Sequence, residues 1–472
     1  MSNKYITTTL PYVNSDPHIG FALEIVQADV WARAQKLIGN TVIFNTGTDE
    51  HGAKIYEKAK EQGKEPQKFV DEYASKFDNL KSALHLCYTN FIRTTAPHHK
   101  QAAQEFWKRC DRNGDIYKKN YKIKYCVGCE LEKTDSELKD GCCPLHPNRE
   151  IDYIEEKNYF FRFSKYQKQL LKLYDEQPDF VQPAHRLAEI RNFVKSGLED
   201  FSISRLKNKM PWGVPVPSDD EQVMYVWFDA LINYISTLGW PYDEKKFSDF
   251  WPGIQVAGKD NLRQQSAMWQ AMLISARLPP SKHIFIHGFI SMNGQKISKS
   301  TGNVVDPFEL VKKYGTDAVR YYLLREIPTL DDGDFSYDRM EQLYDADLAN
   351  ELGNLVSRVT TLAAKDGIVQ HEPVTVFLQN KIYIKLIEQF NFSYVLEDIW
   401  NTIKTTNKLI NDTAPWKLEK AVREKLLKTW LTQLQNLAIN LSPFLPETSE
   451  KIISATSGTI KKIQPLFPRL SK

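Results

Sequence analysis

Residues 5–20, with the sequence YITTTLPYVNSDPHIG, decide the fold because a strand, a polar loop and a helix start follow one another within them. The threonine-rich segment 4–10 is typical of a short buried strand. A helical pattern begins at residue 18 and continues to residue 38. The free N–H groups at such a helix start are suited to binding an anion, such as a phosphate.

The same order of strand, loop and helix returns later in the chain. A strand-like segment at 41–46 precedes a polar loop with glycines and a helical segment at 52–62. Further short strands are expected at 253–257 and 283–287. Alternation of strands and helices is typical of an α/β protein with parallel strands. The sequence therefore predicts a doubly wound, Rossmann-like nucleotide-binding domain.

Two stretches of different composition divide the chain. Residues 117–220 hold four clustered cysteines and many aromatic residues, which indicates an insertion into the nucleotide-binding fold. Beyond about residue 345 glycine becomes rare and apolar side chains recur at helical spacing, with helix breaks expected at Pro415, Pro443 and Pro446. We therefore expect five regions: the first half of the nucleotide-binding domain at 1–116, a connective insertion at 117–220, the second half at 221–290, a linking region at 291–344, and an all-α helix bundle at 345–472.

Composition restricts the class of protein and its compartment. No run of 18 apolar residues occurs, so we expect neither a transmembrane helix nor a membrane partner. The net charge of +3 neither requires nor excludes a nucleic-acid partner. The N-terminal residues lead directly into a strand, without the apolar segment of a signal peptide. Together with the clustered cysteines, this predicts a cytoplasmic location and a metal site in place of disulfides.

A lysine-rich loop follows the last predicted strand. Lys296-Ile297-Ser298-Lys299-Ser300 places two lysines three residues apart behind the Asn293-Gly294 turn. Two ammonium groups on such a loop are able to stabilise the charge that develops on a leaving pyrophosphate. The alternative interpretation, a solvated basic loop, is favoured for this segment taken alone. Its occurrence together with Pro17-His18-Ile19-Gly20 favours the phosphate-binding interpretation.

The two segments together resemble the HIGH and KMSKS signatures of class I aminoacyl-tRNA synthetases. Segments 8–14, 46–52, 225–231 and 258–260 make the resemblance more specific, because they are similar to those of methionyl-tRNA synthetases. The form they resemble is the bacterial one with a single zinc knuckle. The likeness runs from about residue 4 to about residue 450.

The resemblance implies an ATP site. A histidine at a helix start is suited to binding phosphate, although it can also simply cap the helix. Asp260 is able to accept bonds from both ribose hydroxyls, although Gly-Lys-Asp is also an ordinary turn. The second histidine of the HIGH signature is replaced by Phe21, which cannot donate a hydrogen bond, so Asn14 and the loop lysines are the available substitutes. The implied ATP-binding residues are His18, Gly20, Gly258, Asp260, Ile290, Lys296 and Lys299, of which His18, Lys296 and Lys299 are catalytic.

The resemblance also implies a pocket for methionine. Asp49 follows the strand at 41–46 and is able to bind an α-ammonium group, with Glu24 and His51 as polar support, although an Asx turn is the alternative. Aromatic walls suit a thioether, although aromatics at helical spacing are more often plain core. The family usually has a histidine where this chain has Gln265. The implied methionine-binding residues are Leu10, Tyr12, Asp49, Trp227, Ala230, Leu231, Tyr234 and Gln265.

Four residues have the spacing of a zinc knuckle: Cys126, Cys129, Cys143 and His146. Cys142 competes for the third position. We favour Cys143 because its two-residue spacing to His146 matches both the knuckle geometry and the family. Four protein ligands leave no open position, which predicts one structural Zn²⁺.

In the helical region the resemblance implies anticodon recognition by Asn407, Lys408 and Trp416. Single-stranded bases require aromatic faces and amide edges. The alternative for Trp416, a tryptophan that follows a proline in a bundle, is a core position.

The resemblance thus implies ATP-dependent ligation of L-methionine to its tRNA through a methionyl-adenylate, with release of AMP and pyrophosphate. The expected partners are ATP with Mg²⁺, L-methionine, and the initiator and elongator methionine tRNAs, and the chain is expected to be a monomer. Segment 117–220 leaves no room for the large editing insertion of the leucine, isoleucine and valine enzymes. The alternative is a non-catalytic tRNA-binding paralogue, which Phe21 and Gln265 motivate.

Overall fold

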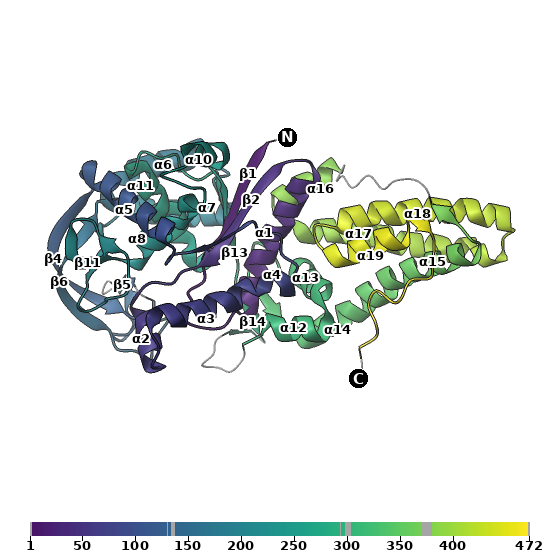
Figure 1. The fold of residues 1–472 in the computed structure, drawn as a ribbon, viewed down its shortest axis with the longest axis horizontal. Helices are drawn as coiled ribbons and strands as arrows, with labels where there is room; N and C mark the ends of the chain where they lie inside the picture. The colour runs from purple at the N-terminus through teal and green to yellow at the C-terminus, as the bar shows by residue number, and fades with distance from the viewer. Residues whose placement is uncertain are drawn as a thin grey trace.

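A six-stranded parallel sheet lies at the centre of the computed structural model (Figure 1), which describes residues 2–129, 131–133, 137–292, 294–297, 304–370 and 380–470. Every neighbouring pair of its strands is parallel. The sheet confirms the predicted doubly wound fold. In spatial order its strands are β3 (Asn90–Arg93), β2 (Thr41–Thr48), β1 (Asn3–Thr8), β12 (Ile254–Gly258), β13 (His283–His287) and β7 (Val181–Gln182).

Strand β1 joins the two halves of the chain. Ile6 lies opposite Phe44 of β2 on one side and opposite Ile254 of β12 on the other. The strand order changes direction between β1 and β12, and open α/β sheets bind ligands at such a switch point. All four strands predicted from the sequence are present, with β1 ending at Thr8.

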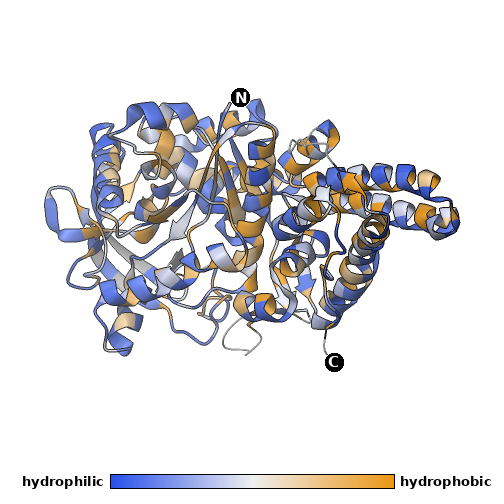
Figure 2. Ribbon diagram, turned by 45° about the vertical axis from the view of Figure 1, so that its right-hand side comes forward, coloured by the Kyte–Doolittle hydropathy of each residue, from blue (hydrophilic) through white to orange (hydrophobic). Residues whose placement is uncertain are grey.

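Helices cover both faces of the sheet. The first and longest of them begins directly after His18, and most of its side chains are buried because it lies between the sheet and the helical region (Figure 1). Figure 2 shows hydrophobic residues concentrated along the strands and the inner sides of these helices. The helices and short helical turns are α1 (Ile19–Leu37), α2 (Ala53–Glu61), α3 (Pro66–Asp78), α4 (Leu80–Ala83), α5 (Pro97–Arg112), α8 (Val226–Ala230), α9 (Asn233–Ser236), α10 (Glu244–Phe250), η3 (Lys259–Asn261), the π-helical η4 (Gln264–Met268) and α11 (Trp269–Ser275).

The region predicted as an insertion forms two small antiparallel sheets and returns once to the main sheet. Strand β7 lies within 117–220 and pairs with β13, so part of this range belongs to the central sheet. The range also holds η2 (Phe163–Tyr166), α6 (Gln167–Glu176) and α7 (Ala184–Lys195). One small sheet has the order β5 (Leu131–Lys133), β4 (Ile116–Cys126), β6 (Asp152–Phe161), β8 (Phe201–Ser202), and the other has β10 (Pro215–Val216), β11 (Asp219–Met224), β9 (Ser204–Leu206).

A linking region and a helix bundle complete the chain. The linking region contains β14 (Ile290–Met292), β15 (Gln295–Lys296), α12 (Pro307–Tyr314), α13 (Thr316–Arg325), β16 (Gly333–Phe335) and α14 (Tyr337–Leu343). The bundle extends away from the sheet, on the side opposite the insertion (Figure 1). It contains η6 (Tyr344–Gly353), α15 (Asn354–Lys365), α16 (Lys381–Glu388), α17 (Phe392–Thr413), η7 (Pro415–Lys417), α18 (Lys420–Leu441) and α19 (Pro446–Ala455), with the short pair β17 (Val369–Gln370) and β18 (Gly458–Thr459).

The predicted breaks at Pro415, Pro443 and Pro446 coincide with the ends of α17, α18 and the start of α19. In the part of the chain that is described, no helix combines the length and the apolar character needed to cross a membrane.

A buried arginine joins the bundle to the nucleotide-binding domain. Arg320 of α13 contacts the Asp29 carboxylate of α1 at 2.8 Å, and both side chains are fully buried. The same guanidinium donates to the carbonyls of Leu84, Pro443 and Phe444. Three separate parts of the chain therefore meet on one cation whose hydrogen bonds are satisfied.

Replacement of Arg320 by methionine should lower the free energy of unfolding by about 3–5 kcal/mol, because the buried Asp29 loses one of its two arginine partners and three carbonyls lose their guanidinium donor. Urea unfolding followed by circular dichroism measures this effect. The matched control is Arg339→Met, which breaks the partly exposed pair with Glu326 and should cost less than about 1 kcal/mol. Equal effects of the two substitutions would contradict the role given to Arg320.

Candidate active site and metal centre

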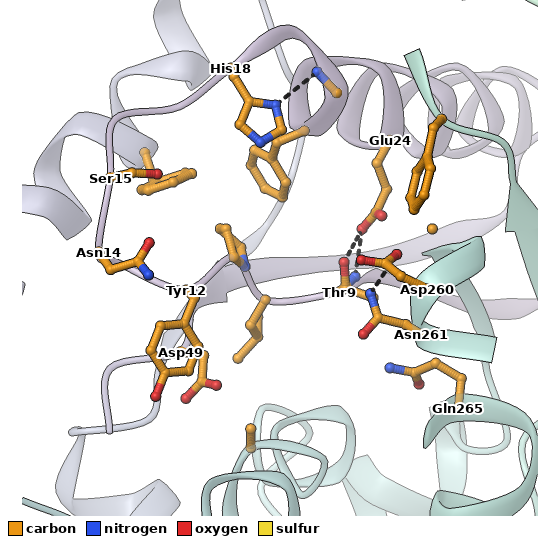
Figure 3. Close-up of a pocket in the computed structure, with 18 of the residues that line it drawn as sticks. Thr9, Tyr12, Asn14, Ser15, His18, Glu24, Asp49, Asp260, Asn261 and Gln265 are labelled. Carbon is orange, nitrogen blue, oxygen red and sulfur yellow. Dashed lines mark hydrogen bonds between the residues drawn. The ribbon is translucent and has the colours of Figure 1, made fainter. Parts of the chain in front are cut away.

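A cavity of about 520 Å³ lies at the carboxyl ends of β1, β2, β12 and β13. Its lining comes from both halves of the chain, including Thr9, Asp49, Asp260 and Gln265 (Figure 3). Its volume lies within the range of ordinary small-molecule sites. The topological switch point of the sheet therefore coincides with a cavity of suitable size.

His18 marks the start of α1 and lines the cavity. Its Nδ1 accepts a hydrogen bond from the backbone N–H of Gly20 at 3.1 Å (Figure 3). Because Nδ1 is an acceptor, the ring hydrogen is carried by Nε2, which is a donor. The histidine thus caps the helix with one nitrogen and offers an N–H with the other. The capping and phosphate-binding interpretations are therefore compatible.

Glu24 lies one helical turn beyond Gly20, in the wall of the cavity. It accepts bonds from the backbone N–H of Thr9 at 2.7 Å and from the Thr9 hydroxyl at 2.6 Å. Its other oxygen lies 3.0 Å from Nε2 of His287, whose Nδ1 lies 2.7 Å from the carbonyl oxygen of Gly288. Both ring nitrogens of His287 face acceptors, an arrangement that favours the protonated ring. Although burial opposes protonation, the hydrogen bond to Glu24 raises the pKa of His287.

Asp49 follows β2 and lies beside Tyr12 in the cavity (Figure 3). Its backbone is held by bonds to Pro11 and Val13, and its side chain is 6% exposed. A buried carboxylate at the end of a parallel strand is suited to binding a cationic group. The ammonium-binding role of Asp49 stays a prediction.

His51, expected as polar support for Asp49, is directed elsewhere. Its Nδ1 lies 2.6 Å from one oxygen of the buried Asp229, and Nε2 of His99 lies 2.8 Å from the other oxygen. Burial alone would raise the pKa of Asp229, but the two imidazoles lower it below the ordinary range. This cluster joins the loop after β2 to α5 and α8.

The residues expected to surround the methionine side chain all lie around one cavity. Leu231 and Tyr234 are buried, Trp227 is half-buried, and Leu10 and Tyr12 close the cavity from the loop after β1. Tyr12 donates its hydroxyl to the carbonyl of His51 at 2.5 Å. Every one of these side chains lines the same cavity, as do Ala230 and Gln265.

The residues expected to bind nucleotide lie along the adjacent edge. Asp260 follows β12 and accepts a bond from the amide of Asn261 at 3.4 Å (Figure 3). A Cβ atom on Gly258 would lie 2.8 Å from Oδ1 of Asp260, so only glycine leaves that carboxylate in place. Ile290 begins β14 and also lines the cavity.

The lysine loop is described only in part. The backbone of Lys296 belongs to β15, and its side chain lies outside the described residues, as does the whole of Lys299. Ile297 lines the cavity, so the described part of the loop reaches the site. The catalytic roles of the two lysines stay predictions.

Phe21 occupies the position of the second signature histidine. Its ring packs edge-on against Phe77 of α3 at 5.4 Å and lines the cavity beside His18. The site therefore has an apolar wall where a hydrogen-bond donor was expected from the family.

The predicted metal ligands converge. One ligand atom from each of Cys126, Cys129, Cys143 and His146 lies within 4.8 Å of the others. Cys142 is not part of this cluster, which agrees with the choice of Cys143. Three sulfurs and one imidazole nitrogen at these separations suit a tetrahedral ion with bonds of about 2.0–2.3 Å. The residues therefore fit a closed metal site.

The knuckle packs against the cavity. A Cβ atom on Gly128 would lie 2.5 Å from the His146 ring, so the turn between the first two cysteines requires glycine. Lys54 of α2 donates to the carbonyl of Gly128 at 3.2 Å, and Gly128 and Cys129 line the cavity. The knuckle therefore forms part of one wall of the site.

The three residues expected at the anticodon differ in accessibility. Trp416 is 51% exposed, and Lys408 is exposed on α17. Asn407 is buried, and its amide donates to the backbone and the carboxylate of Glu351, so it packs inside the bundle. Trp416 is thus a surface residue rather than part of the core.

Arg358 was not predicted as a site residue from the sequence, and its guanidinium lies 5.9 Å from the centroid of the Trp416 ring. Thr9, Asn261 and His287 in the cavity wall were not predicted as site residues either. His287 ends β13, so the rule that ligands bind at the carboxyl ends of strands would have found it. Arg358 belongs to another helix, and no sequence spacing links it to Trp416.

Comparison with known proteins agrees with this geometry. The family model for class I tRNA synthetases (M) matches residues 4–153 and 147–360. A methionine–tRNA ligase of Thermotoga maritima is 42% identical over 96% of this chain and 75% of its own length, and one of Thermosynechococcus vestitus is 43% identical over 97% and 90%.

The Mycobacterium tuberculosis methionyl-tRNA synthetase, solved in complex with methionyl-adenylate, superposes with a TM-score of 0.91 at 33% identity and covers 99% of this chain and 100% of its own. The likeness in sequence and in fold extends over nearly the whole length of the chain. The chain therefore belongs to the methionyl-tRNA synthetase family of class I aminoacyl-tRNA synthetases.

Proposed function

We propose that the chain ligates L-methionine to its tRNA through a methionyl-adenylate, with consumption of ATP and release of AMP and pyrophosphate. The observation that carries the proposal is the convergence of Asp49, His18 and Asp260 on one cavity with an apolar end. A cation site, a phosphate site and a ribose site in this order match an aminoacyl-adenylate from its ammonium group to its ribose. Family membership over nearly the whole chain supports the same reaction.

In the first step a carboxylate oxygen of methionine attacks the α-phosphorus of ATP in line. The bond from that phosphorus to the bridging oxygen breaks, and pyrophosphate leaves with the electron pair. No side chain has to act as nucleophile or base, so positioning and charge stabilisation account for the rate. Asp49 holds the ammonium group, Asp260 holds the ribose, and Nε2–H of His18 donates to the phosphate.

The negative charge that grows on pyrophosphate requires cations. Lys296 and Lys299 are the candidates because in the sequence they are close neighbours of Ile297, which lines the cavity. Mg²⁺ that accompanies ATP would neutralise phosphate charge further. Phe21 contributes no hydrogen bond, so these groups and His18 carry the stabilisation.

In the second step a terminal ribose hydroxyl of the tRNA attacks the carbonyl carbon of the adenylate. The bond from that carbon to the phosphate oxygen breaks, AMP leaves, and the hydroxyl proton passes to the released phosphate or to solvent. Initiator and elongator methionine tRNAs share one anticodon, and we propose that both are substrates.

The paralogue alternative receives less support. A protein that only binds tRNA has no need of a carboxylate such as Glu24 held by three donors, or of a glycine at 258 that keeps room for Asp260. Phe21 and Gln265 are compatible with catalysis, because summed electrostatics matter more than one donor.

We propose that Cys126, Cys129, Cys143 and His146 hold one structural Zn²⁺. With four protein ligands the ion has no position for a substrate, so its contribution is to fix the knuckle against Lys54 and the cavity wall. Thiolate ligands persist in a reducing compartment, which supports a cytoplasmic location. We further propose that 117–220 acts as the connective region and 345–472 as the anticodon-binding region.

Trp416, Lys408 and Arg358 form the candidate surface for the anticodon. An exposed indole with a guanidinium beside it offers a face on which a single-stranded base can stack. Arg358 is oriented by its bond to Asn411 at 2.7 Å. Asn407 is buried, and its side-chain amide donates a hydrogen bond to the Glu351 carboxylate.

Methionine-dependent exchange of pyrophosphate into ATP tests the proposed function. With each of the twenty amino acids supplied in turn, exchange should be strong with methionine alone. Purified protein that binds tRNA but supports no exchange with any amino acid would contradict the proposal and favour the paralogue.

The loop lysines supply a second arm of this test. Lys299→Ala should slow single-turnover adenylate formation by about a hundredfold, equivalent to about 3 kcal/mol of lost transition-state stabilisation. Methionine affinity should change little because the loop meets the triphosphate. Lys312→Ala, an exposed lysine of α12, is the control and should leave the rate unchanged.

Metal analysis after purification without chelators should find about one zinc ion per chain. Cys126→Ser should abolish zinc binding, whereas Cys142→Ser, which changes the neighbouring thiol outside the cluster, should retain it. A folded protein without zinc, or loss of zinc from both variants, would refute the assigned ligand set.

Trp416→Ala should lower kcat/KM for tRNA charging by about tenfold to a hundredfold, because one stacked base is worth roughly 1–3 kcal/mol. Pyrophosphate exchange should be unchanged because the active site lies on another part of the chain. Tyr394→Ala removes a comparably exposed aromatic of α17 and serves as the control. Loss of both activities in Trp416→Ala would indicate a folding role instead.

A further inference from the structure

A chain of buried amides lies behind Gln265, at the apolar end of the cavity. Gln255 of β12, Gln270 of α11 and Ser281 have exposed fractions of 1%, 0% and 3% and do not line the cavity. Buried polar groups lower stability unless each is hydrogen-bonded, so a connected set of three glutamines and a serine needs a physical reason.

The direction of the first hydrogen bonds in this chain is fixed by two backbone groups. The backbone N–H of Ser281 can only donate, and it donates to Oε1 of Gln270 at 2.9 Å. The backbone carbonyl of Gln265 can only accept, and it accepts from Nε2 of Gln270 at 2.8 Å. The amide of Gln270 therefore has one possible orientation.

The remaining directions follow in sequence. Nε2 of Gln270 also donates to the hydroxyl of Ser281 at 3.1 Å. The hydrogen of that hydroxyl finds its acceptor in Oε1 of Gln255 at 2.6 Å. Nε2 of Gln255 then donates to Oε1 of Gln265 at 3.0 Å.

Finally, Nε2 of Gln265 donates to the hydroxyl oxygen of Tyr234 at 2.7 Å. Gln265 sits in the π-helical turn η4, which offsets its side chain from the regular helix that follows. The backbone of Tyr234 is itself held, because its carbonyl accepts from the hydroxyl of Tyr5 at 2.8 Å.

The chain of hydrogen bonds ends at the Tyr234 hydroxyl and determines its orientation. Its oxygen accepts from Gln265, so its hydrogen points away from the relay, and Tyr234 and Gln265 both line the cavity. Burial raises the pKa of Tyr234, so the hydroxyl keeps its hydrogen at any ordinary pH. A reversed relay would instead make the tyrosine an acceptor at the same place.

We propose that Gln270, Ser281 and Gln255 are positioning residues that orient Gln265, and through it the Tyr234 hydroxyl, so that the cavity presents a hydrogen-bond donor to a side chain with a weak acceptor such as a thioether sulfur. The relay thereby contributes to selection of methionine over an isosteric side chain that has a methylene group in place of sulfur. This inference rests on the proposed function, since it concerns the amino acid that the same cavity takes.

The test compares methionine with norleucine, which is nearly isosteric and offers no acceptor. In wild-type protein kcat/KM for pyrophosphate exchange should favour methionine. Ser281→Ala removes the one hydroxyl that transmits direction from Gln270 to Gln255, without touching the cavity. The preference for methionine should fall about fivefold, the size expected for one weak hydrogen bond, while norleucine changes less than about twofold.

Two variants control for packing. Ser281→Thr keeps the hydroxyl and should restore the preference. Ser275→Ala removes an equally buried hydroxyl of α11 that donates to Asp115 outside the relay, and it should leave the preference unchanged. An unchanged preference in folded Ser281→Ala, or an equal loss for both amino acids, would overturn the proposal.

A binding readout separates failure of the relay from failure of the proposed function. Trp227 lines the cavity, so its fluorescence reports the Kd of methionine and of norleucine without catalysis. If wild type supports no exchange but binds methionine more tightly than norleucine, the proposed function fails and the Kd ratio in Ser281→Ala still tests the relay. If wild type binds the two equally, the relay proposal is overturned.

Discussion

The pairing of β1 with β12 is the constraint on which the rest of the structure depends. It places the ends of two strands from opposite halves of the chain side by side, with Thr8 opposite Val256. Thr9 and His18 then approach from one half, and Asp260 and Gln265 approach from the other. The insertion contributes its knuckle to the cavity wall at Gly128. Arg320 fixes the bundle to the first helix of this arrangement.

Two buried acids near the site are held by defined partners. Glu24 is bonded by Thr9 and the His287 ring, and Asp229 by two imidazoles. Asp49 and Asp260 remain in the cavity wall, at the ends where an ammonium group and a ribose are expected. The positive potential for phosphate comes from the helix start at His18 and from the lysine loop. A site of this kind tolerates Phe21 because no single donor carries the whole stabilisation.

The parallel sheet, the metal-binding knuckle and most of the residues that line the cavity could be predicted from the sequence, for identifiable physical reasons. Strand ends in a parallel sheet meet at one edge, so Asp49 and Asp260 could be brought together from position alone. Ligand spacing fixed the knuckle because two short turns leave little freedom. The strand β7 was missed because two residues carry no periodic signal. His51, Asn407 and Arg358 could not be placed, since their partners Asp229, Glu351 and Trp416 are distant in sequence. The amide relay behind Gln265 depends on contacts among α9, β12, η4 and the loop after α11, which no local pattern encodes.

The central claim is that one cavity holds the ammonium group, phosphate and ribose of a single adenylate. A crystal structure with a non-hydrolysable methionyl-adenylate analogue tests it most directly. We predict the ammonium group at Asp49, the phosphate at Nε2 of His18, the ribose hydroxyls at Asp260 and the sulfur facing the hydroxyl of Tyr234. An analogue bound with its ribose or its ammonium group away from these carboxylates, or found outside the cavity, would contradict the account.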